Sequence, residues 1–320
     1  MPNAYLKSGS RNITIKIATR GSPLALYQAK WVQRKILEKH PGLSIELLII
    51  KTTGDRIQDQ PLSNMGGKGL FVKELETALL DRRADLAVHS MKDVTGFFPK
   101  GLEISVIAER EDPRDAWICP KYGSIKNIPL GGKVGTSSLR RSAQLKYYRP
   151  DLEIRFLRGN VVTRLRKLDD EVFDAIILAV AGLKRSGLEK RITEVIPIEL
   201  MLPAIGQGAI GIETRIGDDN TRDHIKHLNH MNTWDCLVAE RSLMTQLEGN
   251  CQTPLAGYCI LNNDELHLRA LIADPEGKSI LEHEKRSSRQ DAVELGREVA
   301  NWLQNNGAYE ILNKIHSPKH

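Results

Sequence analysis

The sequence predicts an α/β protein made of two similar lobes with a cleft between them, and a third, small α+β domain. A strand, a polar loop and a helix follow one another near the start of the chain, and the same pattern recurs in its middle. From Thr233 onward the pattern changes to a helix, three strands joined by tight turns, and a further helix. Strands that alternate with helices form parallel sheets, and a cleft between two such lobes is a common ligand site.

The first lobe is expected to begin with a strand over Ile13–Ala18 and a helix over Leu24–Glu38. Ser22 or Thr19 is placed to cap the start of this helix. Ser44–Lys51 is predicted to be the next strand. The spacing is that of a βαβ unit, so the sheet should be parallel.

Gly66–Gly69 is expected to open the next helix of the first lobe. The apolar face of that helix would consist of Phe71, Leu75, Ala78 and Leu79. Asp85–His89 is predicted to be a buried strand that ends in the polar turn Ser90–Asp93. We expect His89 to be buried with its ring hydrogen-bonded, since no metal-ligand spacing surrounds it.

The second lobe repeats this order. Lys133–Gly135 is predicted to be a strand, and the loop Thr136–Arg141 leads into a helix. Leu152–Leu157 is predicted to be a strand, Val161–Leu168 a helix and Asp174–Val180 a buried strand that ends near a basic turn. The residue identity between the two halves is slight, so the similarity lies in the order of elements.

The third domain is predicted to start with a helix over Thr233–Glu248. Its strands are expected at Tyr258–Leu261, Leu266–Ala273 and Ser279–Arg286, followed by a last helix. The predicted boundaries are residues 1–108 with 209–226 for lobe 1, 114–202 for lobe 2 and 231–320 for the third domain.

Composition excludes several classes of protein. The four cysteines in 320 residues are too few for a disulfide-rich scaffold, and none is spaced as in a zinc ribbon. The longest strongly apolar run, Ala175–Leu183, is half the length of a membrane-spanning helix. The first residues are polar and lack the apolar stretch of a signal peptide. We therefore expect a soluble, cytoplasmic protein that neither enters a membrane nor binds a metal.

Positive charge is concentrated in one segment. Between Lys133 and Arg191 there are 14 Lys and Arg residues, nine of them Arg, against seven Asp and Glu, a net charge of +7. The whole chain carries +6, so the remainder has a net charge of −1. Arginine forms forked hydrogen bonds with carboxylates and phosphates, which favours an acidic ligand. Nucleic acid is the second choice, because aromatic residues make up only 5%.

Two loops could bind an anion. Thr136–Arg141 combines hydroxyls, two guanidinium groups and the free N–H groups of a helix start, although a capped helix with exposed arginines would look the same. The similar loop Thr19–Ser22 in the other half favours the anion site. Gly66–Gly69 could be a phosphate loop, but it lacks the full nucleotide-binding spacing and could be a flexible linker.

Two further positions could carry chemistry. Asp93 follows a parallel strand on the side of the sheet where ligands bind, so it could stabilise a cation or simply pair with Lys92. Cys251 lies in a turn of small and polar residues, where it could be reactive or inert. The other cysteines are expected to be packing residues: Cys119, Cys236 and Cys259.

Taken together, these segments resemble the porphobilinogen deaminase family, also called hydroxymethylbilane synthases, from about Ile15 to Ile315. The resemblance rests on long matching stretches in the same order: residues 17–25, 66–76, 87–94, 109–116, 135–141, 157–160, 202–208 and the Cys251 turn. Two departures are small. Asn250 stands where the family often has glycine, and Thr95-Gly96 stands where a proline is common.

The resemblance implies a transferase of haem and tetrapyrrole biosynthesis, with two lobes like those of periplasmic binding proteins. The enzyme would join four porphobilinogen molecules head to tail, releasing ammonia at each step, to give hydroxymethylbilane. A dipyrromethane cofactor, attached to Cys251 by a thioether, would prime the chain. The implied partner is the small-molecule substrate alone, with no nucleic acid or membrane, and the enzyme would be a monomer.

The resemblance also assigns site residues. The implied catalytic residues are Asp93, Lys92 and Arg20. The implied cofactor-binding residues are Cys251, Ser90, Lys92, Asp93, Thr136, Ser137, Ser138, Arg140, Arg141 and Arg158. The implied substrate-binding residues are Arg20, Ser22, Lys68, Arg158, Arg164, Arg185 and Gln207.

The residues support this assignment on chemical grounds. Each porphobilinogen carries two carboxylates, so a growing chain brings many of them into an arginine-rich cleft. A small-anion binding protein with the same two lobes is the alternative, but it would need neither the third domain nor a reactive cysteine. A nucleic-acid binder would lose affinity steeply with added salt.

Overall fold

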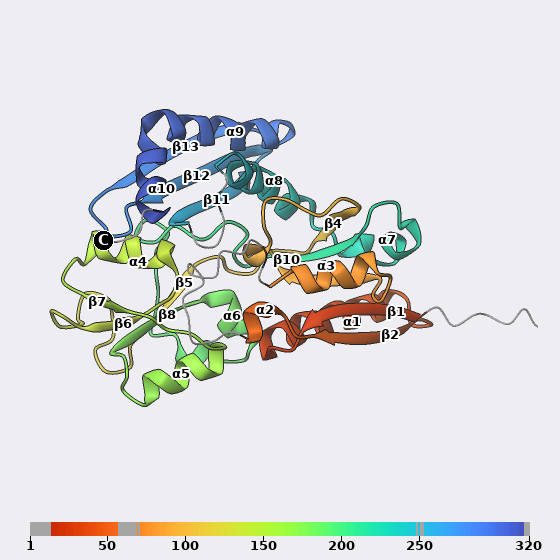
Figure 1. Ribbon diagram of the computed structural model, residues 1–320, viewed down its shortest axis with the longest axis horizontal. Helices are drawn as coiled ribbons and strands as arrows, with labels where there is room; N and C mark the ends of the chain where they lie inside the picture. The colour runs from red at the N-terminus through yellow and green to blue at the C-terminus, as the bar shows by residue number, and fades with distance from the viewer. Residues whose placement is uncertain (1–13, 57–68, 70, 248, 250–252, 317–320) are drawn as a thin grey trace, which may run out of the picture.

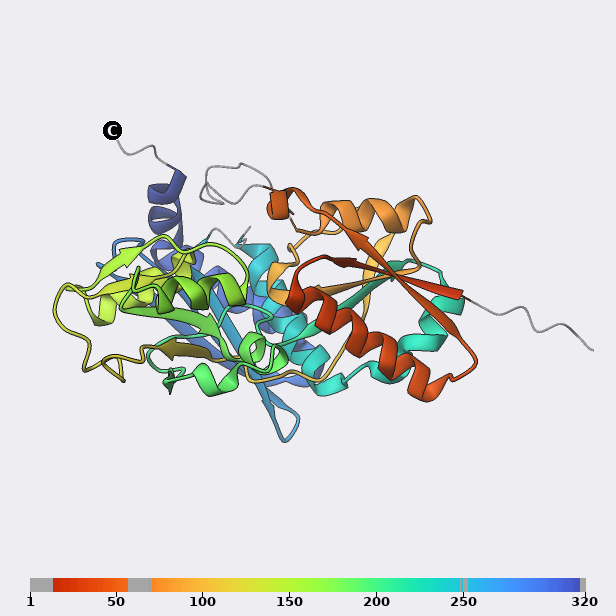
Figure 2. The ribbon, with the colours of Figure 1, turned by 90° about the horizontal axis from the view of Figure 1, so that it is seen from below.

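Three β-sheets organise the computed structural model, which describes residues 14–56, 69, 71–247, 249 and 253–316. Two sheets have five strands each and the third has three. Figure 1 shows the two five-stranded units side by side, with the third unit lying across both of them. Figure 2, turned by 90°, shows the same two units next to each other.

Lobe 1, as we name it, is the unit built on the sheet with strand order β2-β1-β3-β10-β4. Its strands are β1 (Thr14–Arg20), β2 (Ser44–Ile50), β3 (Leu86–Ser90), β4 (Leu102–Ile107) and β10 (Ile210–Arg215). Its helices are α1 (Pro23–Lys39), α2 (Thr53–Arg56), α3 (Lys73–Leu80) and α7 (Asp219–Ile225), with 3₁₀ turns η2 (Met91–Asp93) and η4 (Lys226–Leu228). One face of the sheet packs against α1 and the other against α3, so both faces are apolar.

Lobe 2 is the unit built on the sheet with strand order β7-β6-β8-β5-β9. Its strands are β5 (Asp115–Ile118), β6 (Lys133–Gly135), β7 (Glu153–Arg155), β8 (Ala175–Ala179) and β9 (Glu194–Val195). Its helices are α4 (Leu139–Tyr148), α5 (Val161–Asp169) and α6 (Val180–Arg185), with the 3₁₀ turn η3 (Glu189–Arg191). The core on one face includes Leu145 of α4, and the core on the other includes Leu165 of α5 and Leu183 of α6.

The third domain packs an antiparallel sheet against helices. The strands are β11 (Leu255–Asn262), β12 (Glu265–Ala273) and β13 (Ile280–Ser288), in that order. The helices are α8 (Met231–Gln246), α9 (Ala292–Leu303) and α10 (Tyr309–His316), with η5 (Arg289–Asp291) before α9 and the π-helical turn η6 (Gln304–Ala308) after it. Asn263 and Asp264, both with positive φ, form the tight turn between β11 and β12.

The chain crosses between the lobes twice, at residues 108–114 and 196–209. Glu240 of α8 is fully buried where these crossings meet the third domain, and its carboxylate accepts hydrogen bonds from Arg110, Gly206 N and Cys259 N. Gly208 is required in the second crossing, because φ is +90° and a Cβ would lie 2.3 Å from Glu111 O. One buried carboxylate therefore ties both crossings to the third domain.

The structure confirms the predicted α/β class, with two lobes of the same strand order and a third α+β domain. The expectation of purely parallel sheets is wrong. In lobe 1, β10 runs antiparallel to β3 and β4, and in lobe 2, β5 runs antiparallel to β8 and β9. Phe71 precedes α3 and is not part of its face, and the expected basic turn at Lys184-Arg185 is the end of α6.

Candidate active site

A small cavity lies at the edge of lobe 1 where β1 and β3 end. The residues around it come from both strand ends, from the start of α1 and from the segment before α3, and include Arg20, Ser22, Gln28, Phe71, Val72, His89, Ser90 and Asp93. In a parallel pair of strands the carboxyl ends lie together, which is why residues so far apart in sequence meet here.

Arg20, at the end of β1, is held from three sides. Its guanidinium group bonds the Asp55 carboxylate, with Nη2 2.5 Å from Oδ1 and Nε 3.3 Å from Oδ2. The Phe71 ring lies under it at 4.2 Å, and Asp93 Oδ2 is 3.9 Å from Nη1. Hydrogen bonds from Arg20 and Thr52 hold the pKa of Asp55 below its usual value despite burial. The pair is partly exposed, so it orients Arg20 toward Asp93 more than it stabilises the fold.

Two serines of the cavity make hydrogen bonds within lobe 1. Ser22 is the N-cap of α1, and its hydroxyl accepts a hydrogen bond from Ala25 N, as the sequence predicted. Ser90 Oγ lies 2.9 Å from Nε2 of the buried Gln28. The catalytic candidate thus follows a strand whose last residue is tied to a neighbouring helix.

On lobe 2 the loop after β6 contributes hydroxyls that are used inside the protein. Ser137 Oγ donates to Leu157 O, and Ser138 Oγ caps α4 by accepting from Arg141 N. Thr136 is buried and its Oγ1 accepts from Ser138 N at 3.2 Å. These contacts set the loop's shape, so a ligand would meet a preformed helix start.

Arg140 and Arg141 are buried rather than exposed, and both bind the same carboxylate. Arg140 Nη1 and Arg141 Nη2 each lie 2.7 Å from an oxygen of Asp115, which is fully buried at the start of β5. The two guanidinium groups hold the pKa of Asp115 well below its usual range, although burial opposes this. The Arg140 Nε atom is buried with no hydrogen-bond partner among the residues that the structure describes.

Cations of the two lobes lie close enough to repel one another. Burial and repulsion from Arg141 lower the pKa of Lys92 to about 8, although Asp93 and Asp115 act in the opposite direction. Burial and repulsion from Arg141 and Arg158 lower the pKa of Arg164 to about 10, with Asp93 again opposing. Positive charge therefore exceeds the neighbouring carboxylates, and an anionic ligand would relieve this imbalance.

The remaining predicted residues lie on lobe 2 and on the second crossing. Burial lowers the pKa of Arg158 and of Arg185, and Arg185 Nη2 donates to Gly208 O at 2.7 Å. Arg164 Nε donates to Gly159 O at 2.7 Å. Gln207 is buried in the second crossing, where Nε2 donates to Asp115 Oδ1 at 3.0 Å. Gln207 is thus in contact with the arginine pair through Asp115.

Two predicted residues, Lys68 and Cys251, lie outside the described residues, as does most of the loop Gly66–Gly69. The three other cysteines are free and buried, as expected of packing residues: Cys119, Cys236 and Cys259. His89 is also buried, and its Nε2 lies 2.9 Å from Glu213 Oε2, which confirms the expected hydrogen-bonded ring.

Sequence reasoning missed four residues of the site: Asp55, Gln28, Phe71 and Asp115. Asp55 follows a strand end in a Thr-Gly-Asp turn, which is a usable signal because such turns often carry ligand groups. Asp115 begins a buried strand, where an ionised carboxylate requires partners, and two adjacent arginines elsewhere could have suggested them. Gln28 and Phe71 carry no local signal.

The site fits the dipyrromethane that the family resemblance implies. Such a cofactor brings several carboxylates, and the unpartnered Arg140 Nε together with the repelling cations Lys92 and Arg164 is the donor set that carboxylates prefer. Asp93 is the acidic group facing these cations from lobe 1.

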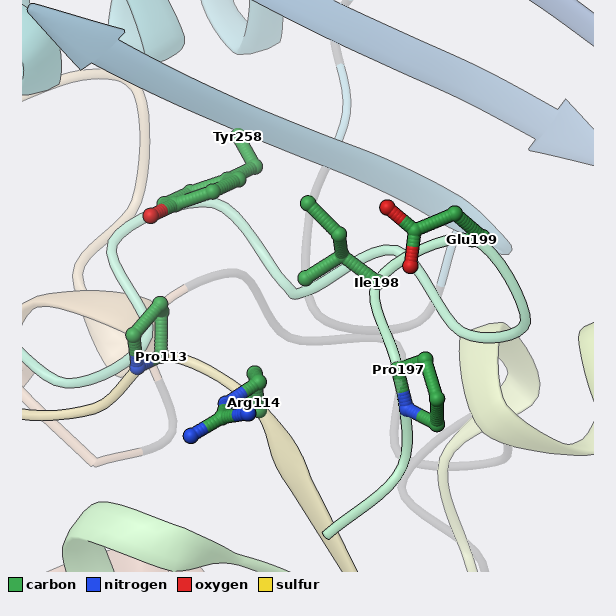
Figure 3. A pocket seen from close by; sticks show the side chains of 6 residues that line it. All are labelled: Pro113, Arg114, Pro197, Ile198, Glu199 and Tyr258. Atoms are coloured by element: carbon green, nitrogen blue, oxygen red, sulfur yellow. The ribbon is translucent and has the colours of Figure 1, made fainter.

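A second hollow of about 310 Å³ lies elsewhere, where both crossings meet β11. Figure 3 shows Tyr258 reaching down from β11 toward Pro113 and Arg114 of the first crossing, with Pro197, Ile198 and Glu199 of the second on the other side. The predicted site residues are not among those that line it. This hollow therefore lies where the two crossings contact the third domain, away from the predicted site residues.

Several solved structures resemble this chain at low identity. The extracellular-binding protein of a probable amino-acid ABC transporter of Bacillus subtilis is 14% identical, with 72% of this chain and 96% of that chain covered and a TM-score of 0.40. The methionine-binding protein MetQ is 16% identical, with 67% and 88% covered and a TM-score of 0.41. The periplasmic VFT2 domain of BvgS from Bordetella pertussis is 14% identical, with 68% and 93% covered and a TM-score of 0.36.

Family models match nearly the whole chain. The model described as porphobilinogen deaminase, dipyromethane cofactor binding domain, matches residues 15–223. The model described as porphobilinogen deaminase, C-terminal domain, matches residues 234–305. Within the described part of the chain, each helix is too short or too polar to span a membrane. The chain belongs to the porphobilinogen deaminase family of hydroxymethylbilane synthases, transferases of tetrapyrrole synthesis that use porphobilinogen and a dipyrromethane cofactor.

Proposed function

We propose that this chain joins four porphobilinogen molecules into hydroxymethylbilane in the cleft between its two lobes, with Asp93 on lobe 1 and the arginines of lobe 2 as the working groups. The observation that carries the proposal is the position of Asp93, which lies among Arg20, Lys92 and Arg164 at the end of a central strand. A carboxyl group in this place lines the cavity where a ligand would meet it.

Asp93 would stabilise the positive charge that develops on a substrate pyrrole when its amine leaves as ammonia. A carboxylate aimed at a developing cation is worth most where water is excluded. Arg20, which Asp55 and Phe71 hold against Asp93, would orient this carboxylate and contact a substrate carboxylate. Ser22 would line the substrate side of the cavity.

The cations of lobe 2 would bind carboxylates of the cofactor and of the growing chain. Thr136, Ser137 and Ser138 present a helix start, while the cationic members of this set are Arg140, Arg141, Arg158, Arg164 and Arg185. Gln207 would hold Asp115 in place between the two buried arginines. When bound, the dipyrromethane supplies the pyrrole end to which the first substrate unit is joined.

Lys92 would bind a ligand carboxylate, and its own charge would depend on the pH. With a pKa of about 8 it is mostly protonated at pH 7, and it loses its charge as the pH rises through that value. A carboxylate bound beside it would favour the charged form and raise this pKa. Ser90 would keep the turn that carries Lys92 and Asp93 fixed to Gln28.

We also propose that Cys251 anchors the cofactor and that Lys68 contacts substrate. Both assignments rest on the sequence match, since these residues lie outside the described part of the chain. The neighbouring residues Gly249 and Thr253 follow α8, which packs on the crossings between the lobes.

The proposed organisation keeps the predicted boundaries: residues 1–108 with 209–226, residues 114–202 and residues 231–320. The sheets support them, since each proposed unit contains one complete sheet. We further propose a monomer acting in the cytoplasm. The three free, buried thiols agree with a reducing compartment, and the cleft combines residues of both lobes within one chain.

Intact-mass spectrometry tests the proposal directly. The purified protein should weigh more than its sequence by one dipyrromethane, should colour with Ehrlich's reagent, and should release ammonia from porphobilinogen. Cys251→Ser should remove both the added mass and the activity, whereas Cys119→Ser and Cys236→Ser should keep them. An unmodified protein that binds porphobilinogen without releasing ammonia would instead be a small-anion binding protein.

A further inference from the structure

Three ionisable side chains lie buried together behind the candidate active site. Glu76 of α3, His89 of β3 and Glu213 of β10 are 8%, 5% and 1% exposed. Ionisable groups are rarely buried unless they are paired or share protons. Among the described residues, no set of three or more His, Cys, Asp and Glu side chains is arranged to hold a metal ion.

The three side chains share one face of the lobe 1 sheet. In the antiparallel pairing of β3 and β10, Ala87 lies opposite Glu213, so His89, two residues further along β3, projects on the same side. His89 Nε2 lies 2.9 Å from Glu213 Oε2, where the ring N–H donates to the carboxylate. Helix α3 packs on this face through Leu75 and Leu79 and brings Glu76 to it.

Other charged groups around Glu76 are engaged elsewhere or act weakly on it. Lys73 of its own helix attracts it, and Arg241 of α8 attracts Glu213. Arg215 of β10 pairs with Asp85 and Asp218. On the other strands that contact α3, the side chain of Arg20 pairs with Asp55, Glu103 pairs with Arg222, and Lys16 is exposed.

The two carboxylates cannot both be ionised at little cost. Burial and repulsion from Glu213 raise the pKa of Glu76 to about 7, although His89 and Lys73 oppose this. Glu213 Oε1 is buried with no hydrogen-bond partner among the described residues. A proton on Glu76 would therefore lower the repulsion between the two carboxylates.

The same strands carry the turn that holds Asp93. His89 lines the cavity together with Ser90 and Asp93. Met91 N donates to Ala209 O at 3.0 Å, and the Met91 side chain packs so closely on β10 that a Cβ at Gly211 would lie 2.1 Å from its sulfur. A shift of β10 relative to β3, or a change in charge between these two strands, would therefore move the Ser90–Asp93 turn.

We propose that Glu76, Glu213 and His89 act as one buried acid–base cluster that positions the Ser90–Asp93 turn and adds negative charge behind Asp93 when Glu76 is ionised. The added charge favours the cation that develops on the substrate, in the same direction as Asp93 itself. Glu76 is a positioning residue here, since it acts through His89 and the turn. The inference rests on the proposed role of Asp93.

The test is the pH dependence of kcat for porphobilinogen consumption by the holoenzyme. The wild-type kcat should rise through an ionisation near pH 7. Glu76→Gln keeps the shape of the protonated side chain, so it should match the wild type at pH 6, lose this rise, and be about tenfold slower at pH 8 with KM little changed. Glu103→Gln, a carboxylate change at the surface of the same sheet, should leave the profile unchanged.

Glu213→Gln provides a second, independent variant. Removing the neighbouring negative charge should lower the pKa of Glu76, so the rise in kcat should move to lower pH rather than disappear. Circular dichroism at each pH checks that both variants are folded. A wild-type profile in either folded variant would overturn the inference. An Asp93→Asn enzyme with full activity would instead overturn the proposed role of Asp93, whatever the profiles of the Glu76 variants.

Discussion

Lobe 1 and lobe 2 have the same strand order but carry different charged groups after corresponding strands. In each lobe one strand, β1 or β6, has a buried threonine next to its end and leads through a serine cap into a helix: Thr19 and Ser22 in lobe 1, Thr136 and Ser138 in lobe 2. In lobe 1 a later strand ends in a turn that carries Asp93. In lobe 2 the helix start carries Arg140 and Arg141.

The arginines of the two lobes differ in burial as well. Arg20 is 21% exposed in its side chain and its partner Asp55 is 26% exposed, whereas Arg140, Arg141 and Asp115 are almost fully buried. A partly exposed pair contributes little to stability, while breaking a buried pair is costly. The same framework thus holds a partly exposed ion pair in lobe 1 and a buried one in lobe 2.

The largest expected effect is at Asp93. Asp93→Asn keeps the size of the side chain and removes its charge, so kcat should fall by about 10²–10³, or roughly 3–4 kcal/mol of transition-state stabilisation. Asp93→Glu keeps the charge on a longer arm and should retain measurable activity. Steady-state kinetics give the rates, and mass spectrometry of stalled enzyme–substrate complexes separates failed chemistry from failed binding.

Both Asp93 variants should keep the wild-type melting temperature, because Asp93 is a partly exposed cleft residue. If Asp93→Asn elongated the chain at close to the wild-type rate, Asp93 would be only an ion-pair partner of Arg20 and the division of labour between the lobes would be wrong.

The second prediction compares arginines of the two lobes by the same substitution. Arg141→Lys, or Arg140→Lys, keeps the charge but loses part of the forked contact with Asp115, so stability should fall by about 1–3 kcal/mol along with cofactor assembly. Arg20→Lys should change stability by about 1 kcal/mol or less, yet slow elongation. Urea denaturation measures the first effect, and single-turnover kinetics measure the second.

Equal losses of stability in Arg141→Lys and Arg20→Lys would contradict the proposal that the buried ion pair stabilises the protein more than the partly exposed one. Near-wild-type rates in all three lysine variants would reduce these residues to ordinary ion pairs.

The last prediction concerns the stability of the protein as a function of pH. The pKa of Glu76 is raised from 4.5 to about 7, so its buried proton is retained in the folded state while the unfolded chain releases it. The wild type therefore loses stability as the pH rises from about 4.5 to 7 relative to Glu76→Gln. Urea denaturation should find the variant more stable than the wild type at pH 8 and equal to it at pH 4.5. An equal difference at both pH values would place the effect in packing rather than in the proton.

Much of the fold could be predicted from the sequence because its signals are local. The boundaries of α1 and β2 were within one residue of prediction, and Ser22 was named among two cap candidates. The antiparallel strands β5 and β10 could not be placed, since each is fixed by pairing with distant strands rather than by its own pattern. Phe71 is apolar and helix-compatible, but its contact with Arg20 lies outside α3.

The site was predictable in its residue types and less so in its contacts. The Arg-rich segment and the Ser90–Asp93 turn were identified from composition and position, and their roles remain predictions. Both arginines point inward and pair with Asp115. The sequence could not predict this pairing, because residues 115 and 140–141 are separated in sequence and meet only when β5 joins its sheet. Glu76 and Glu213 gave no signal for the same reason.

The path of β10 has a consequence for synthesis on the ribosome. Every strand of lobe 2 lies between Asp115 and Val195, whereas lobe 1 lacks its strand between β3 and β4 until residue 215 has been made. Chains generally fold domain by domain as they emerge. Lobe 2, which begins second, is therefore the first lobe that can be completed. The strands of lobe 1 that precede it keep an open sheet edge on β3 until β10 has been synthesised, about a hundred residues later.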